Sequence, residues 1–249
     1  MEQKGHPRRL TYSIGGVSFD MILVEHGTFV MGREPERDGD QYYDDKRAHE
    51  VTLTQDYYIG ETQVTQALWS AVMGSNPSKM RGDDERPVEN VFWGDCQAFV
   101  EKLNGQVEGV RFALPTEAQW EYAARGGNRS KGYKYAGGDE PDEVAWHKGN
   151  AGGETHPVGQ KKANEIGVYD MSGNVCEWCA DWYGEYPTEA VVEPRGPQEG
   201  DSRVIRGGSF GGRADRSRSA YRDAYAPEMR DGEIGMRLVC TVVGPTGDK

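Results

Sequence analysis

Cysteine, histidine and long apolar runs are all scarce in this 249-residue sequence. It contains four cysteines and five histidines, and the cysteines form no pattern typical of a disulfide-stabilised scaffold. Neither His147 nor His156 has a second histidine or a cysteine at the spacing of zinc ligands. The sequence therefore predicts neither a disulfide framework nor a zinc centre.

Long hydrophobic segments are missing as well. No apolar run approaches the ~18 residues that a membrane span needs, and residues 1–16 lack the hydrophobic core of a secretory signal. We therefore expect no membrane insertion and, by default, a cytoplasmic location, unless an export signal lies outside this sequence. The formal net charge of −12 disfavours long-range attraction to nucleic acids and to anionic membranes.

Glycine and aromatic residues, in contrast, are abundant. The sequence has 34 glycines, 12 prolines, 6 tryptophans and 13 tyrosines, which predicts a loop-rich fold whose core relies on large aromatic side chains. The length fits a single domain spanning residues 1–249, with its core at about residues 20–243. Both strand and helix signals occur along the chain, so we expect the α+β class.

Two apolar stretches near the N-terminus predict a β-hairpin. Residues 20–24 and 28–31 alternate or run apolar, and His26 and Gly27 suit the turn between them. Residues 33–50 are strongly charged and almost devoid of aliphatic side chains, which predicts an exposed loop. The acidic residues of this loop lack the spacing and the central glycine of a calcium-binding loop.

Capping signals and apolar faces predict short helices in the next part of the chain. Thr65 is suited to cap a helix over residues 66–73, and Gly74 is suited to end it. A second helix is predicted over residues 94–104, where Cys96 lies among apolar residues at helical spacing and is interpreted as a buried small hydrophobe.

The third predicted helix has the clearest N-terminal signal. Thr116 and Gln119 have the spacing of a capping box, and Gly126-Gly127 marks the end of the helix. Residues 128–162 are rich in glycine and polar side chains, with tyrosine and tryptophan at intervals. We expect ordered coil there, because the aromatic rings can anchor it to the body of the domain.

The C-terminal third of the sequence, residues 167–243, carries the strongest functional signal. Val204-Ile205 and residues 234–243 are apolar anchors, whereas residues 206–233 between them are rich in Gly, Arg, Asp, Ala and Ser. A segment of this composition cannot fill a core. It is typical of surface loops pinned at each end by strands, where binding and catalytic side chains often lie.

Several motifs resemble the formylglycine-generating enzyme (sulfatase-modifying factor) family. They are GNVCEW, RGGSF and IGMRL in the C-terminal third, preceded by GTFVMG (27–32), YYIGETQVTQALWSAVMGSNPS (57–78), PVENVFWGDCQAFVEKLN (87–104) and LPTEAQWEYAARGG (114–127). The resemblance covers about residues 20–243 and implies a C-type-lectin-like fold with little regular secondary structure. It does not by itself imply the enzyme's activity, because fold and function separate easily.

The turn motif DMSGNVCEW offers oxygen ligands of the kind that calcium prefers. In the family that the sequence resembles, a structural calcium ion is bound at this turn. The resemblance implies as its ligands the Asp170 side chain, the carbonyls of Gly173 and Val175, and Glu177. The alternative is that the two acidic side chains accept hydrogen bonds from backbone amides and that no metal is bound. The family's second calcium loop has no match around residues 144–146.

The aerobic enzymes of the family bind copper through two cysteines, five residues apart, shortly after the GGS motif. These positions correspond to Gly212 and Ser217, and neither can replace a thiolate ligand. The tryptophan of the family's GNxWEW turn is replaced by Cys176. Cys176 and Cys179 have C-x-x-C spacing, but no βαβ pattern precedes them, so we interpret them as independent buried thiols. We therefore expect no copper, no catalytic residue and no formylglycine formation.

The loops of residues 210–233 are then interpreted as a surface that binds a protein or a cell-surface ligand. Arginine and tyrosine give large, adaptable contacts, and mixed charge gives orientation. The tract also resembles the variable region of retroelement-diversified lectin-fold proteins, in which RGGSW, RSAYR and IGFR-like anchors form a frame for ligand-contacting residues. By that analogy the candidate contacts are Phe210, Gly211, Gly212, Arg213, Asp215, Arg216, Asp223, Ala224, Tyr225, Ala226, Arg230, Asp231, Gly232 and Glu233.

Two other functions stay open at this point. A divergent oxidase acting on a sulfatase cysteine predicts copper binding and conversion of a cysteine-containing peptide. A regulatory or scaffold module predicts that the 210–233 loops only close the fold, because surface loops often carry no function.

Overall fold

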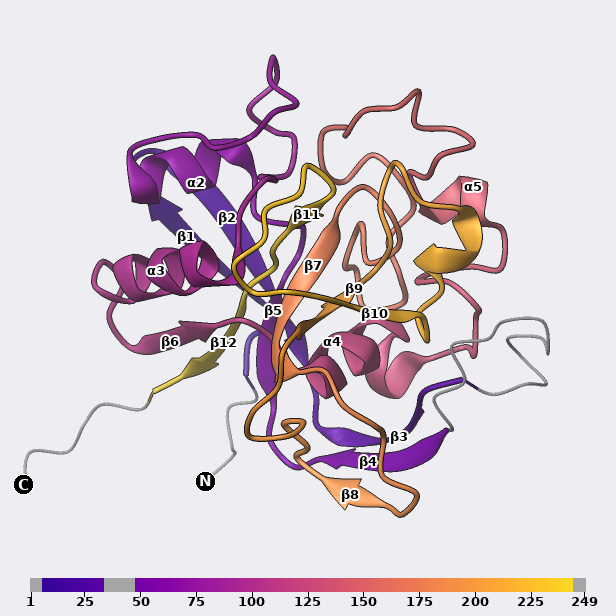
Figure 1. Cartoon of the computed structure of the whole chain (residues 1–249). Coiled ribbons are helices and arrows are strands. Elements are labelled where there is room, and N and C mark those ends of the chain that lie inside the picture. The colour runs from indigo at the N-terminus through magenta and orange to yellow at the C-terminus, as the bar shows by residue number, and fades with distance from the viewer. Residues whose placement is uncertain (1–5, 34–47, 244–249) are drawn as a thin grey trace, which may run out of the picture.

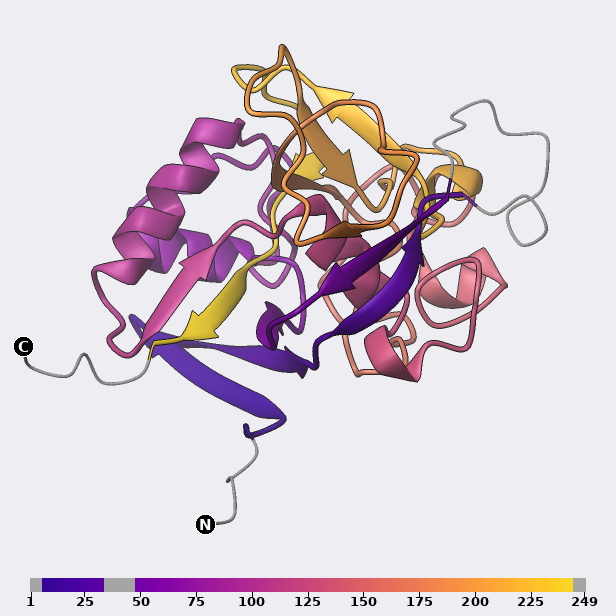
Figure 2. The same ribbon diagram turned by 90° about the horizontal axis from the view of Figure 1, so that it is seen from below.

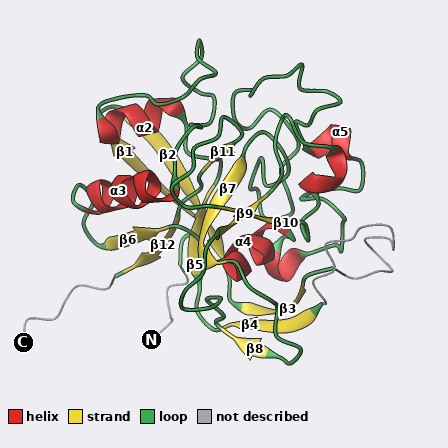
Figure 3. Ribbon diagram, viewed as in Figure 1, coloured by secondary structure: helices red, strands yellow, loops and turns green. Residues whose placement is uncertain are grey.

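The computed structural model describes residues 6–33 and 48–243 (Figure 1). Long irregular connections join short strands and short helices (Figure 3), which confirms the loop-rich α+β architecture predicted from composition. The predicted charged loop falls mostly on residues 34–47, which lie outside the described residues. No helix in the described parts of the chain combines the length and the apolar character that crossing a membrane requires.

The largest sheet joins the beginning of the chain to its end. Its strand order is β1-β2-β5-β12-β6, and every neighbouring pair is antiparallel. The strands are β1 (Arg9–Ile14), β2 (Val17–Val24), β5 (Tyr57–Gly60), β12 (Val239–Val242) and β6 (Val110–Ala113). Because β12 pairs with both β5 and β6, the C-terminal strand completes the sheet that the N-terminal strands begin.

A small three-stranded sheet, at the bottom of Figure 1, has the order β3-β4-β8. Its strands are β3 (Gly27–Met31), β4 (His49–Leu53) and β8 (Val191–Val192). β4 pairs antiparallel with β3 and parallel with β8. The N-terminal part of the chain is thereby joined to the segment that follows β7.

The hairpin predicted between residues 20–24 and 28–31 is wrong. β2 pairs with β1 through a turn at Gly15-Gly16 and with β5, whereas β3 pairs with β4. Gly27 permits a close approach, because a Cβ at this position would lie 2.3 Å from the hydroxyl oxygen of Tyr122. An alternating pattern identifies a strand and its faces, but it does not identify the strand's partner.

The three predicted helices are confirmed as α2 (Gln66–Met73), α3 (Trp93–Asn104) and α4 (Glu117–Ala124). The Thr65 hydroxyl caps α2 by accepting a backbone N–H of the first turn, and Thr116 and Gln119 form the capping box of α4. The rings of Trp69 and Phe99 stack with centroids 5.0 Å apart, which joins α2 to α3. In Figure 2 the two helices lie on the same side of the molecule as the yellow strand β12 and its partner β6.

Residues 128–162 form ordered coil, as predicted, with helical turns only at η1 (Gly127–Arg129) and α5 (Pro141–Val144). Tyr135 is 5% exposed. The ring of Trp146 stacks on that of His156 with centroids 3.8 Å apart. Aromatic side chains thus anchor a segment that has few backbone hydrogen bonds of regular structure.

A four-stranded sheet from the C-terminal third positions the candidate site. Its order is β10-β9-β7-β11, with β11 parallel to β7 and the other pairs antiparallel. The strands are β7 (Cys176–Trp182), β9 (Arg203–Arg206), β10 (Arg222–Tyr225) and β11 (Ile234–Gly235), and the turn η2 (Ala214–Ser217) lies between β9 and β10. Two hydrophobic clusters support this sheet, and each contains a fully buried tryptophan, Trp178 in one and Trp120 in the other.

Candidate functional site

Buried arginines fix the loops of the C-terminal third. Arg206, at the end of β9, is 1% exposed and pairs with Glu121 of α4. Its guanidinium also donates to the three successive carbonyls of residues 219–221. Arg222, at the start of β10, donates to both carboxylate oxygens of Glu117, at 2.7 and 2.6 Å. Charge-assisted bonds with this geometry fix both the position and the orientation of a loop.

A third buried arginine, Arg237, lies behind the turn that leads into β7. It donates to the two carboxylate oxygens of Glu177 at 2.8 and 3.0 Å, and the indole N–H of Trp120 donates to the same carboxylate at 2.6 Å. Arg237 also donates to the carbonyls of Gly60 and Tyr169. Arg237 and Glu177 are both 0% exposed. Their charges are therefore compensated inside the protein, where an unpaired charge would be strongly destabilising.

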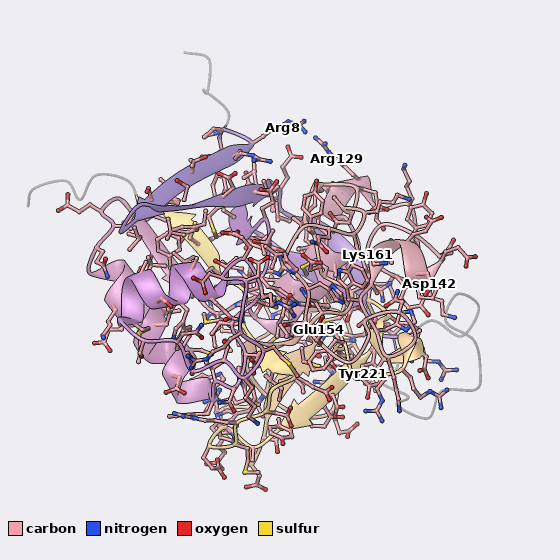
Figure 4. All side chains as sticks on the ribbon, turned by 90° about the horizontal axis from the view of Figure 1, so that it is seen from above. Arg8, Arg129, Asp142, Glu154, Lys161 and Tyr221 are labelled. Carbon is pink, nitrogen blue, oxygen red and sulfur yellow. The ribbon has the colours of Figure 1, made fainter. Side chains whose placement is uncertain are left out.

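An open pocket of about 290 Å³ lies over the four-stranded sheet. Its lining consists of Cys176, Ile205, Gly208, Ser209, Gly211, Gly212, Arg216, Tyr221, Asp223, Tyr225, Asp231, Glu233 and Ile234. Tyr221, which Figure 4 labels, lies beside the strands of the C-terminal segment. The pocket thus lies within the part of the chain that the sequence marks as functional.

Three carboxylates line the pocket and accept hydrogen bonds from neutral hydroxyl groups. The pairs are Asp223 with the Tyr221 hydroxyl (3.0 Å), Asp231 with the Tyr225 hydroxyl (3.3 Å) and Glu233 with the Ser209 hydroxyl. Within residues 6–33 and 48–243, none of the three carboxylates forms an ion pair. Arg216 is the single arginine in the lining. The pocket therefore carries an excess of negative charge.

Cys176 contributes the one sulfur atom of the pocket lining. Burial raises the pKa of its thiol, and the negative charges of Asp223 and Glu233 raise it further. The thiol is therefore protonated at neutral pH, whereas the thiolate is the form that attacks and binds metals. Cys179 is fully buried, and both cysteines are free. The interpretation of the C-x-x-C sequence as two independent thiols is confirmed, but the expected burial is wrong for Cys176, which is half-buried and lines the pocket.

The two positions that correspond to copper-binding cysteines have different surroundings. Gly212 lines the pocket, whereas Ser217, at the end of η2, is 0% exposed. The Ser217 hydroxyl has no hydrogen-bond partner among the described residues. At the positions where the family resemblance implies copper-binding cysteines, the chain thus has a hydrogen atom and a buried hydroxyl, neither of which is a soft ligand of the kind that Cu(I) prefers.

The structure brings many of the predicted contact residues together. Gly211, Gly212, Arg216, Asp223, Tyr225, Asp231 and Glu233 line the pocket. Arg213, Asp215, Ala224, Ala226, Arg230 and Gly232 lie outside its lining. Arg213 is exposed and pairs with Asp215 at 3.1 Å, and Arg230 pairs with Asp95 of α3 at 3.0 Å. Phe210 is 6% exposed, so its ring belongs to the interior.

Other lining residues were not predicted as contacts, and Gly208 and Tyr221 were assigned to the frame. The missed residues are Cys176, Ile205, Ser209 and Ile234. Strand pairing explains two of them, since Ile205 is opposite Asp223 in the β9–β10 ladder, and Ile234 is opposite Cys176 in the β11–β7 ladder. A register between distant strands cannot be read from local sequence.

The four residues implied as calcium ligands do come together, but around an amide nitrogen. Gln63 Nε2 lies 2.8 Å from the Val175 carbonyl oxygen and 2.9 Å from Glu177 Oε1. It lies 3.3 Å from each of the carbonyl oxygens of Asp170 and Gly173. Asp170 thus contributes its carbonyl rather than the expected carboxylate, which accepts a backbone N–H at 2.7 Å. The sequence interpretation gave Gln63 no role.

Comparison with known proteins identifies the family of this chain. Residues 17–242 match the model of the "Sulfatase-modifying factor enzyme 1-like domain". "Chaperone protein LppX" of Paenibacillus barcinonensis is 35% identical over 274 aligned positions, which cover 90% of each protein. The "Formylglycine-generating enzyme" of Streptomyces coelicolor is 35% identical over 195 positions, which cover 70% of this chain and 58% of the enzyme.

Two solved structures share the fold over nearly the whole chain. "Treponema denticola variable protein 1" superposes with a TM-score of 0.82 at 34% identity, covering 94% of this chain and 99% of that protein. PvdO from Pseudomonas aeruginosa superposes with a TM-score of 0.72 at 27% identity, covering 90% and 94%. The expected C-type-lectin-like α+β fold is confirmed, and the chain belongs to the sulfatase-modifying factor (formylglycine-generating enzyme-like) domain family.

Proposed function

We propose that this chain is a non-catalytic recognition protein whose C-terminal pocket receives a side chain of a protein or cell-surface ligand. The observation that carries the proposal is the open pocket itself. It is built on loops that buried arginines hold in place, and it retains three carboxylates without a cation partner among the described residues. A rigid frame that presents unpaired polar groups is suited to binding, since little ordering is needed when a ligand docks.

The charge of the pocket indicates the class of ligand. Asp223, Asp231 and Glu233 face a space in which Arg216 is the single cationic lining residue. A lysine or arginine side chain of a partner would gain charge-assisted hydrogen bonds there. Tyr221 and Tyr225 add aromatic surface, which attracts cations and contributes contact area at small entropy cost.

The alternative function as an oxidase has less support. Gly212 and Ser217 occupy the positions of the copper-binding cysteines, and burial raises the pKa of Cys176, the remaining thiol in the pocket. The Treponema denticola relative, whose name describes it as a variable protein, favours recognition. So does the resemblance to lectin-fold proteins that vary the residues between conserved anchors.

A peptide-display selection tests the proposal directly. The wild-type protein is expected to enrich peptides that contain lysine or arginine from a random library. The variant Asp223→Asn/Asp231→Asn/Glu233→Gln is expected to lose the enrichment at an unchanged melting temperature, because the substitutions keep the size of each side chain. The control Asp84→Asn/Asp201→Asn/Glu101→Gln removes the same charge from exposed positions and should retain the enrichment.

Two results would contradict the proposal. Equal enrichment by the wild type and the pocket variant would place recognition elsewhere, and no enrichment by either would favour the scaffold alternative. Copper-dependent oxygen consumption with a cysteine-containing sulfatase peptide would establish the oxidase instead.

A further inference from the structure

Gln63 lies in the short connection between β5 and α2 and is 1% exposed. Its side-chain nitrogen has four oxygen atoms within 3.3 Å, from the carbonyls of Asp170, Gly173 and Val175 and from the carboxylate of Glu177. An amide group has two N–H bonds and can donate directly to two acceptors at a time. The turn therefore presents more oxygen atoms than an amide needs.

The backbone of the turn explains why so many oxygen atoms converge. Asp170, Gly173 and Asn174 all have positive φ angles, of 55°, 80° and 64°. For residues other than glycine this conformation is uncommon and is maintained by its surroundings. Here it helps to direct the carbonyls of Asp170, Gly173 and Val175 toward one point. Three carbonyls and one carboxylate form the kind of ligand set that a hard cation such as Ca²⁺ takes.

With Gln63 in place, these residues do not fit a metal ion. The amide nitrogen occupies the point where the four oxygen atoms converge. The negative charge of Glu177 is already matched by Arg237 and by the indole of Trp120. Without a cation at this point, the reverse orientation of the amide would place Oε1 against the same four oxygen atoms. In the observed orientation Oε1 has no hydrogen-bond partner among the described residues.

We propose that the Gln63 amide substitutes for the calcium ion that the family resemblance implies, so that the turn is ordered without metal in this chain. The same four oxygen atoms then form a latent calcium site, which becomes available when the amide is removed. Gln63 acts as a positioning residue that crosslinks the β5–α2 connection to the turn before β7.

The crosslink reaches the pocket through backbone hydrogen bonds. The Gly173 N–H donates to the Gly207 carbonyl at 2.7 Å, and the Phe210 N–H donates to the Asn174 carbonyl at 2.8 Å. Gly207 and Phe210 flank Gly208 and Ser209 of the pocket lining. We therefore expect the shape of the pocket to be independent of calcium in the wild-type protein.

Calorimetric titration with CaCl₂ and thermal melts with and without EDTA test two statements: that the wild-type turn needs no calcium, and that removal of the Gln63 amide creates a calcium site. The wild-type protein is expected to show no calcium binding and no change of melting temperature. Gln63→Ala is expected to bind one Ca²⁺ with a Kd on the order of 10⁻⁴ M, since one ligand is charged. Its melting temperature should then rise by roughly 5 °C in about 5 mM Ca²⁺.

Gln66→Ala is the matched control. Gln66 is also a buried glutamine, and its Nε2 donates to the carbonyls of Met80 and Pro87 with no carboxylate among its acceptors. This variant should lose stability without any recovery in calcium.

Stoichiometric calcium binding by the wild-type protein would overturn the proposal, and this measurement holds whether or not a variant folds. If Gln63→Ala folds but its melting temperature does not rise in calcium, the proposal of a latent calcium site is wrong. If calcium also raised the melting temperature of Gln66→Ala, the stabilisation by calcium would not be specific to the turn before β7.

Discussion

The interior and the pocket of the C-terminal third use the same charged residue types in opposite ways. Inside, Arg206, Arg222 and Arg237 each face a carboxylate of another element. In the pocket, the carboxylates accept hydrogen bonds from hydroxyl groups and have no cation partner among the described residues. The first set fixes the loops, and the second is the set that we propose a ligand contacts.

A single strand illustrates the difference. Arg222 and Asp223 are adjacent in β10, and because successive side chains of a strand point to opposite faces, Arg222 is buried whereas Asp223 lines the pocket. A shift of one residue in the pairing of β10 would exchange the two. Arg222 prevents this shift, because its two hydrogen bonds to Glu117 fix the register.

The largest effect on stability is expected when one partner of a buried ion pair is removed. Arg237→Met leaves Glu177 unpaired at 0% exposure, which should lower the free energy of unfolding by about 3–5 kcal/mol. Urea denaturation measures the loss. Arg213→Met removes an exposed arginine that pairs with Asp215 and should change stability by no more than about 0.5 kcal/mol. If both variants lost similar amounts of unfolding free energy, the buried arginines would not stabilise the protein more than an exposed one does.

A buried carboxylate that forms no ion pair among the described residues should respond to pH. Burial, together with the negative charge of the nearby Glu117, raises the pKa of Asp181 to about 7. The unfolded chain releases this proton near pH 4, so the contribution of Asp181 to stability is complete below that pH and is lost as the pH rises toward 7. Between about pH 5 and pH 8 the loss is roughly 2–3 kcal/mol.

Asp181→Asn should remove this pH dependence, because the amide does not titrate. Urea unfolding of the wild type and the variant at both pH values measures the difference, with the exposed Asp201→Asn as control. A wild-type loss that persists unchanged in Asp181→Asn would assign the titration to another group.

A smaller effect is expected from crowding the pocket. A Cβ at Gly211 would lie 2.4 Å from Glu233 Oε1, so Gly211→Ala should displace the carboxylate from Ser209. Binding of a selected cationic peptide should weaken by about tenfold, or about 1.4 kcal/mol. In Gly232→Ala the new Cβ meets its nearest neighbours at 3.4 and 3.5 Å, and binding should be retained. Fluorescence anisotropy compares the two, and equal affinities would exclude Glu233 from the binding site.

The smallest change concerns reactivity alone. Although Cys176 lines the pocket, its raised pKa keeps the thiol protonated, so iodoacetamide should modify it at least about tenfold more slowly than a free cysteine at pH 8. The Asp223→Asn/Glu233→Gln variant should react faster than the wild type, because two carboxylates that raise the pKa are removed. Mass spectrometry of the modified peptide measures both rates. A wild-type rate equal to that of free cysteine would mean that a thiolate is available in the pocket.

Local sequence signals predicted the helices well and the strand partners poorly. Thr65 and Thr116 cap their helices through residues three positions later, so the contacts that define these helices lie within one turn. The sequence predicted a hairpin turn at His26 and Gly27, whereas the hairpin of β2 turns at Gly15-Gly16. The second partner of β2 is β5, a strand that lies beyond β3 and β4 in the sequence.

In the candidate site, too, local sequence predicted some features and not others. The RGGSF and IGMRL anchors bracket the candidate segment, and many of the predicted contacts line its pocket. Arg213 and Arg230, equally polar in the sequence, pair with neighbouring acids outside it. Phe210 is buried. Whether a loop side chain points into a pocket depends on the conformation of the loop, which its own sequence does not specify.

The sequence by itself determined the family, the fold class and the three helices, because these depend on residue identity and short-range spacing. Tertiary structure decided which carboxylates remain available in the pocket and that the Gln63 amide lies at the centre of the turn before β7. Both depend on contacts between segments that are distant in the chain. Such contacts are selected by packing and by the compensation of buried charge across the whole domain.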